Sequence, residues 1–384
     1  MKYLKYYIST LTLILAICLV FLGPYYPTAF FLIFSIFIIV GDYFLPEDVK
    51  VNKYSYPFLL YLPIYINLPL LIILLTATVG VLGDNTSGWF FEVFESYTQI
   101  NLSLTQDTIT TTDKVFLIIL VSLFIGIMGT VPGHELVHRK GNRLNLFIGN
   151  WLLALSWDCA FAIEHVHGHH KNVCLLNDPA SAKRGENIYG FIIRAILKEH
   201  LDAWNIQSNR KRKGRVFSSF IKNDMLIGYM RSLSITVCSF LIGGVLGLGV
   251  FLVCAFIAKS LLEVINFTEH YGLVREKGKP VFERHSWNSN SLLSSIYLYN
   301  VTRHSSHHQK VNLKYWELEP SQGAPMMPQG YLSMLFISLL IPPLFHNIMA
   351  KKLRDWDNVH ATEGEQILGK IQNDKSGIHL LMNN

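Results

Sequence analysis

Long apolar segments constrain the fold of this chain more than any other feature of its sequence. An α-helix needs about 20 mostly apolar residues to cross ~30 Å of hydrocarbon. Several stretches approach that length, and the last, 229–269, is long enough for two crossings with a glycine-rich reversal near Gly244. We therefore predict an all-α integral membrane protein with six transmembrane helices. The predicted spans are 7–23, 27–45, 56–82, 115–133, 229–247 and 249–269.

The first span resembles a signal peptide, because Lys2 and Lys5 precede it. A signal peptide ends in a small-residue cleavage site, whereas this chain continues through 23–27 into another apolar stretch, so we predict a retained anchor. Two further apolar stretches, 144–163 and 331–349, contain an aspartate and two adjacent prolines, respectively. We expect both to be interfacial or re-entrant pieces.

The composition supports the membrane class, since 51% of the residues are hydrophobic and only 16% are charged, against about 25% charged in soluble domains. A disordered chain, a collagen-like chain and a small disulfide scaffold are thereby excluded. The five cysteines form no C-x-x-C pair, which excludes a cysteine-based zinc site and a fused rubredoxin-like module. We expect one domain over 1–384, because the motifs interlock along the chain.

Charge predicts the orientation. The stretch 171–222 contains eleven Lys or Arg residues, whereas 83–113 contains none. The positive-inside rule places the first stretch in the cytoplasm and the second outside. Both termini then lie in the cytoplasm, with a histidine-rich cap formed by 134–228 and 270–384. We expect the basic residues to face solvent or lipid headgroups, and no nucleic-acid partner, because no reading domain accompanies them.

Three short histidine clusters predict a metal site. The first, His134-Glu135-Leu136-Val137-His138, ends the fourth span. Histidines at i and i+4 share one helix face, so both can meet one metal ion. The same H-E-x-x-H pattern marks zinc proteases. One zinc needs only three protein ligands, however, and this chain offers many more, so we set the protease interpretation aside.

The other two clusters each end in a His-His pair. His165 and His169 are again i, i+4, and His170 is turned by about 100° on an α-helix, toward a neighbouring metal. His304 pairs with His307 and His308. His270 ends a polar stripe at the cytoplasmic end of the sixth span. The candidate ligands of a two-metal centre are His134, His138, His165, His169, His170, His270, His304, His307 and His308.

For the remaining histidines we favour ordinary surface or core roles; these are His167, His200, His285, His346, His360 and His379. Imidazole suits zinc, copper, iron and nickel. Nine neutral ligands can hold two iron ions with four to five imidazoles each. A carboxylate-rich di-iron site would use the carboxylates of Glu-x-x-His pairs as ligands, whereas the candidate ligands here are imidazoles. Spacing alone leaves the metal open.

The three clusters resemble the histidine signature of integral-membrane di-iron hydroxylases and desaturases. The segment 266–273, NFTEHYGL, is similar to the N-Y-x-E-H-Y-G-L box of the alkane monooxygenase (AlkB-type) family, with Phe267 in place of Tyr. The segments NDPAS at 177–181, RGEN at 184–187 and HSWNSN at 285–290 also resemble that family. The resemblance covers about 30–360. The tail from Lys352 resembles the related xylene monooxygenases instead.

The resemblance implies the activity. It implies two iron ions held by the nine histidines, O₂ as co-substrate, and terminal hydroxylation of n-alkanes to 1-alkanols in a bacterial inner membrane, with the active site facing the cytoplasm. Electrons would come from NAD(P)H through a rubredoxin or ferredoxin-type carrier and its reductase. Glu135, Glu164, Asp178 and Glu269 would orient imidazoles or relay protons, and Arg303 would balance charge or bind a carboxylate.

Three other functions remain open from the sequence: a xylene-type methyl hydroxylase, a membrane lipid desaturase, and a non-enzymatic metal transporter or sensor. Transporters place ligands near the bilayer midplane and often contain internal repeats, whereas these ligands gather on one side and no repeat is visible. The basic stretch 194–222, with its run Arg210-Lys211-Arg212-Lys213, is either a docking site for an acidic carrier or a contact with anionic lipid.

Overall fold

The computed structural model describes residues 2–84, 88–211 and 223–382. The regular elements of this described part are helices, apart from an isolated bridge between Asn288 and Met326. The chain divides into two compact units that alternate along the sequence. Unit 1 draws its described residues from 1–37, 54–159 and 220–259, and unit 2 from 38–53, 160–219 and 260–384. The single domain over 1–384 stays a prediction.

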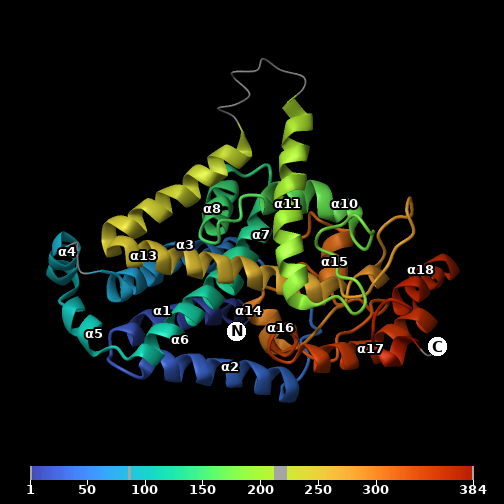
Figure 1. Ribbon diagram of the computed structural model, residues 1–384, viewed down its shortest axis with the longest axis horizontal. Helices are drawn as coiled ribbons and strands as arrows, with labels where there is room; N and C mark the ends of the chain where they lie inside the picture. Colours follow the sequence, from blue (N-terminus) through green and yellow to red (C-terminus); the bar gives the residue numbers. More distant parts are fainter. Residues whose placement is uncertain (1, 85–87, 212–222, 383–384) are drawn as a thin grey trace. The chain divides into compact units, whose positions relative to one another are not determined.

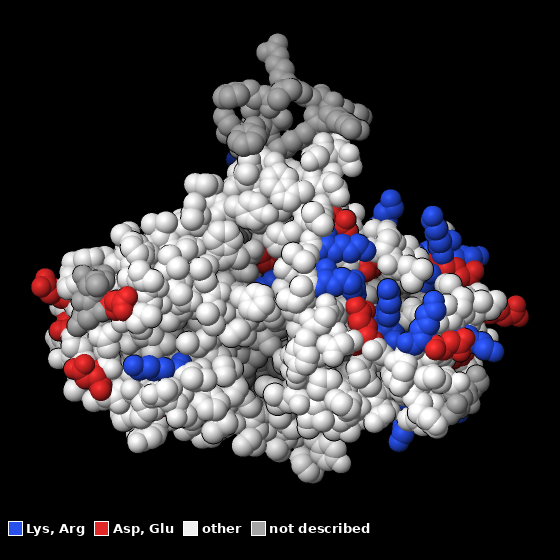
Figure 2. Space-filling view, in the orientation of Figure 1, with Lys and Arg blue, Asp and Glu red and all other residues white. Residues whose placement is uncertain are grey.

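The helices of unit 1 are mostly apolar. They are η1 (Leu4–Tyr6), α1 (Tyr7–Val20), α3 (Phe58–Leu82), α4 (Gly88–Thr98), α5 (Leu102–Thr108), α6 (Thr111–Phe124), the π-helix η2 (Ile125–Thr130), α7 (Val131–Val137) and α8 (Arg143–Ala154). Two helices, α2 (Tyr26–Phe44) and α13 (Asp224–His270), pass from one unit into the other. Figure 2 shows acidic side chains on the part of unit 1 that carries α4 and α5.

The helices of unit 2 are shorter, and their polar side chains are more often buried. They are α9 (Phe161–Glu164), the π-helix η3 (His165–His169), α10 (His170–Asn172), α11 (Ile188–Lys211), η4 (Glu283–His285), α14 (Leu292–Tyr297), α15 (His304–Gln309), α16 (Tyr331–Leu340), α17 (Pro342–Val359), α18 (Glu363–Asn373) and α19 (His379–Met382). The second and third histidine clusters lie in such short helices.

Among the described residues, four continuous helices are long and apolar enough to cross a membrane, which fits an integral membrane protein. They are α2, α3, the run from α6 to α7 (Thr111–Val137) and α13. The first predicted span is the shorter apolar stretch Leu4–Val20. The stretch 331–349 is interrupted at Pro342, where α16 ends and α17 begins, and 144–163 is divided between α8 and α9.

The predicted reversal within 229–269 is a sharp bend in α13. Gly243 and Gly244 leave the helical conformation, and Gly244 has φ 60°, a region that favours glycine. A side chain at Gly83 would approach the Cα of Gly243 to 2.4 Å, so glycines at both positions allow α3 and α13 to touch at the bend. In Figure 1 the two halves of α13 run in clearly different directions.

A buried ion pair accounts for the aspartate in the apolar stretch 144–163. Asp158 Oδ2 lies 2.8 Å from Lys259 Nζ of α13, and their side chains are 0% and 5% exposed. An ionisable residue in a membrane helix is tolerated when it is paired. Asp158 therefore compensates the charge of Lys259 within unit 1.

Candidate metal centre

Four buried histidines of unit 2 form a compact group, the histidine quartet: His169 ends η3, His270 ends α13, and His304 and His308 lie in α15. One ring nitrogen from each lies within 4.8 Å of the others. The four residues come from three separate parts of the chain, yet their nitrogens meet at one point. Such convergence of nitrogen donors is typical of a metal site.

The hydrogen bonds of two quartet members leave Nε2 directed at that point. His169 Nδ1 donates to the Asp178 carboxylate, at 3.1 and 3.0 Å from its oxygens, and His169 Nε2 has no hydrogen-bond partner among the described residues. His270 Nδ1 donates to the carbonyl oxygen of His285 at 3.0 Å. Metal-binding histidines usually make this arrangement, in which the second ring nitrogen donates to a carboxylate or carbonyl.

Several ring nitrogens of the quartet lie within hydrogen-bond distance of one another, but too few of them carry a proton for each contact to be a hydrogen bond. His304 Nε2 lies 3.2 Å from His270 Nε2 and 2.8 Å from His308 Nε2. His270 carries its proton on Nδ1 when neutral, so its Nε2 presents a lone pair. Burial also lowers the pKa of His308 well below its ordinary value, which keeps that imidazole neutral. A cation shared by these nitrogens satisfies them together, so the residues fit a metal ion.

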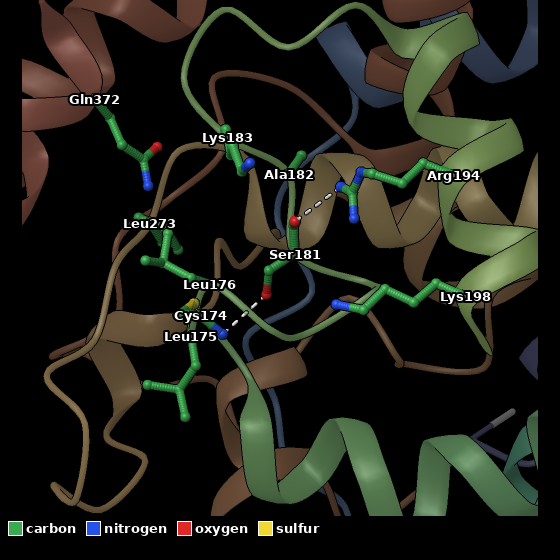
Figure 3. A pocket seen from close by; sticks show the side chains of 10 residues that line it. All are labelled: Cys174, Leu175, Leu176, Ser181, Ala182, Lys183, Arg194, Lys198, Leu273 and Gln372. Atoms are coloured by element: carbon green, nitrogen blue, oxygen red, sulfur yellow. Dashed lines mark hydrogen bonds between the residues drawn. The ribbon is translucent and has the colours of Figure 1, made fainter. Parts of the chain in front are cut away.

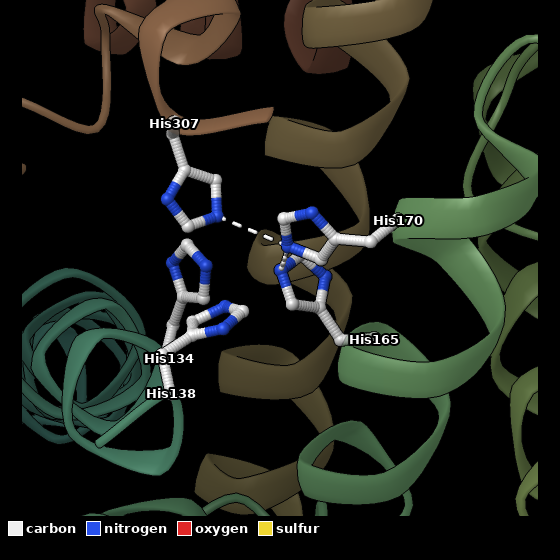
Figure 4. A group of neighbouring side chains, drawn as sticks. All are labelled: His134, His138, His165, His170 and His307. Atoms are coloured by element: carbon white, nitrogen blue, oxygen red, sulfur yellow. Dashed lines mark hydrogen bonds between the residues drawn. The ribbon is translucent and has the colours of Figure 1, made fainter. Parts of the chain in front are cut away.

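Three further histidines of unit 2 form a second group, the histidine trio: His165, His170 and His307. His170 Nε2 lies 3.1 Å from His165 Nε2 and 3.2 Å from His307 Nε2. In Figure 4, dashed lines mark these two close approaches within the trio. The trio offers three imidazole ligands to a metal ion.

The winding of η3 changes the pairing that the sequence predicts. On an α-helix His165 would share a face with His169 at i+4, but η3 is a π-helix, in which residues at i and i+5 align. His165 consequently pairs with His170, and His169 turns toward the quartet. In α15 the α-helical spacing brings His304 to His308, and His307 points to the trio.

In unit 1, α7 carries the first cluster. His134 and His138 have ring centroids 5.0 Å apart, as expected for neighbours at i and i+4. Glu135 Oε1 accepts hydrogen bonds from Arg139, at 3.0 Å from Nε and 2.6 Å from Nη2. His134 and Glu135 thus lie within α7, His138 is its C-cap residue, and Arg139 compensates the charge of Glu135.

Of the predicted carboxylates, Asp178 is the most firmly held beside a quartet member. Ser181 Oγ donates to its carboxylate at 2.5 Å and accepts from the Cys174 backbone at 2.8 Å. Figure 3 shows Ser181 between Cys174 and Arg194, lining a hollow of about 210 Å³. Burial raises the pKa of Asp178, but the neighbouring His169 imidazole and the Ser181 hydroxyl lower it overall. Asp178 is therefore a carboxylate.

Two other predicted carboxylates are buried in unit 2. Glu269 Oε2 lies 3.3 Å from His304 Nε2, next to the quartet. Glu164 lies against Gly168, where a Cβ would come within 2.2 Å of Glu164 Oε1, so a larger residue there would displace the Glu164 carboxylate. Arg303 pairs with a carboxylate, as predicted: its guanidinium lies 3.7 Å from the Asp48 carboxylate. The same group also donates to the backbone carbonyls of Leu318 and Asp48.

A network of hydrogen bonds supports His270, and the sequence did not predict it. The carbonyl of His285, which orients His270, also accepts the Cys174 thiol at 3.1 Å. His285 Nδ1 accepts from the Phe282 backbone, and its Nε2 donates to Glu365 Oε1 at 2.8 Å. Glu365 belongs to a capping box at the start of α18. The pattern Thr362-x-x-Glu365 marks the helix start, but nothing in it indicates the contact with His285.

The Glu365 carboxylate is held in its charged form. Burial raises its pKa, but hydrogen bonds from His285 and from Arg284 outweigh that effect and lower the pKa to about 2. Burial lowers the pKa of His285, so its imidazole is neutral. The network is therefore a neutral imidazole donating to a carboxylate, which Arg284 also contacts at 2.8 Å.

The helices and the buried histidine groups indicate the class of protein, and the comparison with known families identifies it. The chain belongs to the fatty acid desaturase family. Residues 114–337 match the family described as "Fatty acid desaturase", and this match includes all nine predicted ligands. Within that family the chain groups with alkane and xylene monooxygenases. The predicted family is confirmed.

Individual relatives differ in how much of the chain they match. Alkane 1-monooxygenase 1 of Pseudomonas aeruginosa is 38% identical over 235 residues, 60% of this chain and 61% of the relative. Alkane 1-monooxygenase 2 of Alcanivorax borkumensis is 34% identical over 244 residues, 62% of this chain and 63% of the relative. The xylene/toluene monooxygenase hydroxylase component XylM of Pseudomonas putida is 32% identical over 344 residues, 88% of this chain and 86% of the relative.

Proposed function

We propose that this protein is a membrane monooxygenase that hydroxylates an unactivated C–H bond of a hydrophobic substrate, using O₂ at a histidine-held di-iron centre. The observation that carries the proposal is the quartet, with its buried Nε2 atoms and its Asp178 and His285 supports. The family relatives named as alkane and xylene monooxygenases support the same chemistry.

We propose the nine clustered histidines as the iron ligands, divided between two ions. The quartet serves one ion and the trio contributes to the other. His134 and His138 are proposed as ligands from their spacing in the sequence. What supports this division is the imidazole chemistry of all nine, the separate convergence of quartet and trio, and the shared helix face of the pair on α7. When bound, the iron pair supplies the reduction of O₂ that places one oxygen atom in the substrate and releases the other as water.

The chain's own residues hold and orient the site. Asp178 keeps the proton of His169 on Nδ1, and the carbonyl of His285 does the same for His270, so both Nε2 atoms face the metal position. The quartet is buried, which excludes bulk water from a reaction that water would disturb. Glu269, beside His304, and Glu164, over Gly168, are proposed to relay protons or orient imidazoles, and Glu135 has the same proposed role on α7.

The first candidate substrate is an n-alkane, hydroxylated at its terminal carbon to a 1-alkanol. The second is a methyl group on an aromatic ring. One observation favours the second: the similarity to XylM spans 88% of the chain, whereas that to the alkane 1-monooxygenases spans about 60%. An alkyl chain or aryl ring has no polar handle, so either substrate needs an apolar slot that presents one carbon to the iron.

We further propose six membrane crossings, with both termini and the nine histidines in the cytoplasm of a bacterial inner membrane. The basic stretch 171–222 and the absence of Lys and Arg from 83–113 support this orientation. The bend at Gly243 and Gly244 supports two crossings within α13. Electrons are proposed to come from NAD(P)H through a reductase and a rubredoxin or ferredoxin-type carrier.

The test is product analysis with purified protein, a carrier system and ¹⁸O₂, using n-octane and m-xylene as parallel substrates. The proposal predicts two iron ions per chain and one ¹⁸O atom per product alcohol. An unsaturated product without ¹⁸O would instead indicate a desaturase. Active protein that contains zinc and no iron would contradict the di-iron assignment, and bound metal without any product would favour a transporter or sensor.

A further inference from the structure

A surface hollow of about 1050 Å³ in unit 2 reaches one member of the histidine trio. His170 is part of its lining, together with the chain that follows it, 171–177, and a second loop, 275–281. His170 is only partly buried, whereas His165 and His307 are buried. The hollow therefore leads from solvent to a proposed iron ligand.

The charged side chains that line this hollow, within the described part of the chain, are all cationic. Lys171, Lys277 and Lys279 are exposed. The fourth cation, Arg275, is buried and donates to the backbone carbonyls of Val173, Lys171 and Lys279 at 2.8, 2.7 and 2.6 Å. Arg275 thus ties the two loops together, so the three lysines are held on a preformed rim. Figure 2 shows Lys and Arg on unit 2, interspersed with Asp and Glu.

The lining between the lysines is apolar. Leu176 is 77% exposed, and Leu175, Val281 and Leu368 also line the hollow. An apolar centre inside a charged rim is the usual anatomy of a protein interface. A concave surface also suits a protruding protein better than a flat membrane, so we favour a protein as the occupant.

We propose that an acidic electron-carrier protein docks in this hollow and that its electrons enter the metal centre through the imidazole of His170. The proposal rests on the proposed monooxygenase function and names the surface for its electron partner. Each docking would pass one electron from the carrier, which is oxidised by one, to the iron that His165, His170 and His307 would hold. Two dockings and two protons from water balance the reduction of O₂ to one inserted oxygen atom and one water.

This surface differs from the one that the sequence indicates. The predicted docking run Arg210-Lys211-Arg212-Lys213 lies outside the described side chains, whereas the hollow combines Lys171 with two lysines more than a hundred positions later. Its charges surround a proposed ligand, and opposite charges on a carrier would speed association by steering, an effect that salt screens over ~8–10 Å.

The test measures binding rather than turnover. A rubredoxin with a net negative charge is immobilised, and detergent-solubilised protein is passed over it at low and high salt. The triple variant Lys171→Gln, Lys277→Gln, Lys279→Gln should associate about tenfold more slowly at low salt, and the difference should shrink at high salt. Leu176→Ser should weaken binding at both salt concentrations. A matched variant with Lys310→Gln, Lys351→Gln and Lys375→Gln, all exposed outside the hollow, should bind like the parent.

Equal binding by the two triple variants would overturn the proposal. It would also be overturned if the hollow variant kept its affinity for rubredoxin but lost binding to vesicles of phosphatidylglycerol and phosphatidylcholine, because the hollow would then contact lipid. Iron content, measured in every variant, should not change. Product formation by the parent with dithionite tests the proposed function separately, so failure there is distinguishable from failure of docking.

Discussion

Glu365 accepts a hydrogen bond from His285 at 2.8 Å, across 80 positions of the sequence. This hydrogen bond connects α18 to the quartet, since the backbone carbonyl of the same His285 accepts a hydrogen bond from His270 Nδ1. A change at Glu365 can therefore act on a proposed iron ligand through one intervening residue. Glu365 is a positioning residue in this scheme and does not touch the metal position.

We expect Glu365→Ala to weaken metal binding. Losing a partner behind the ligands typically costs about 10–100-fold in metal affinity, and Glu365→Gln should cost less, because its amide oxygen can still accept from His285. Affinity is measured by competition with a chelator. The control is Glu363→Ala, an exposed position in the same first turn of α18. Equal affinity in Glu365→Ala and the parent would contradict the role.

The lowered pKa of the Glu365 carboxylate predicts that the folded protein loses stability at acid pH. Its pKa is about 2 in the folded protein against an ordinary value of 4.5. Because the folded pKa is depressed, the stabilisation is fully present above about pH 4.5 and is lost as the pH falls toward 2. The lowered pKa of His285 acts in the same direction below pH 6.5, where the unfolded chain takes up the proton more readily. Thermal unfolding in detergent from pH 7 to pH 3 should show a shallower decline for Glu365→Gln than for the parent.

Asp178→Ala should release the imidazole of His169. Without the carboxylate the Nδ1 proton has no acceptor, so the ring can rotate or change tautomer, and iron affinity should fall about 10–100-fold. The iron affinity of Asp178→Asn should lie between those of the parent and Asp178→Ala, since an amide oxygen still accepts a hydrogen bond but carries no charge. Iron per chain after dialysis is the measurement. Asp355→Asn, at an exposed position of α17, is the control, and a similar loss of iron there would point to a general effect.

His169→Ala and His167→Ala provide a matched pair within one turn of η3. His169 belongs to the quartet, whereas His167 belongs to neither group. His169→Ala should therefore abolish turnover and lower the iron content, and His167→Ala should retain most of both. If the two variants behaved alike, the separation of ligand from non-ligand in this segment would be wrong.

Cysteine labelling tests the orientation. In a background with Cys18 and Cys238 changed to serine, Asn101→Cys should react with an impermeant reagent added to intact cells, and Asn209→Cys should not. Both asparagines are exposed in the structure, so accessibility of the side chain does not limit labelling. The opposite pattern would place the histidines on the outer side of the membrane.

The sequence predicted the membrane class and the histidine clusters because both depend on local patterns. Apolar runs report membrane helices, and the histidines of α15 follow the ordinary α-helical period. The pairing in η3 was not predictable in this way, because a π turn adds a residue to the winding without any marker in the letters HVHGHH. Glu365 was missed for another reason: its contact with His285 depends on how α18 packs, and the distance in sequence carries no signal.

The π turn in η3 has a further consequence. His169 and His170 are consecutive residues, yet one belongs to the quartet and the other to the trio. The peptide bond between them is a fixed covalent link between the two proposed metal positions. Thermal motion of the surrounding helices therefore changes the distance between the two metal positions less than it would if His169 and His170 belonged to separate helices. A deletion of one residue between His165 and His169 would restore α-helical winding and leave His165 aligned with the present His170, which would then stand at i+4.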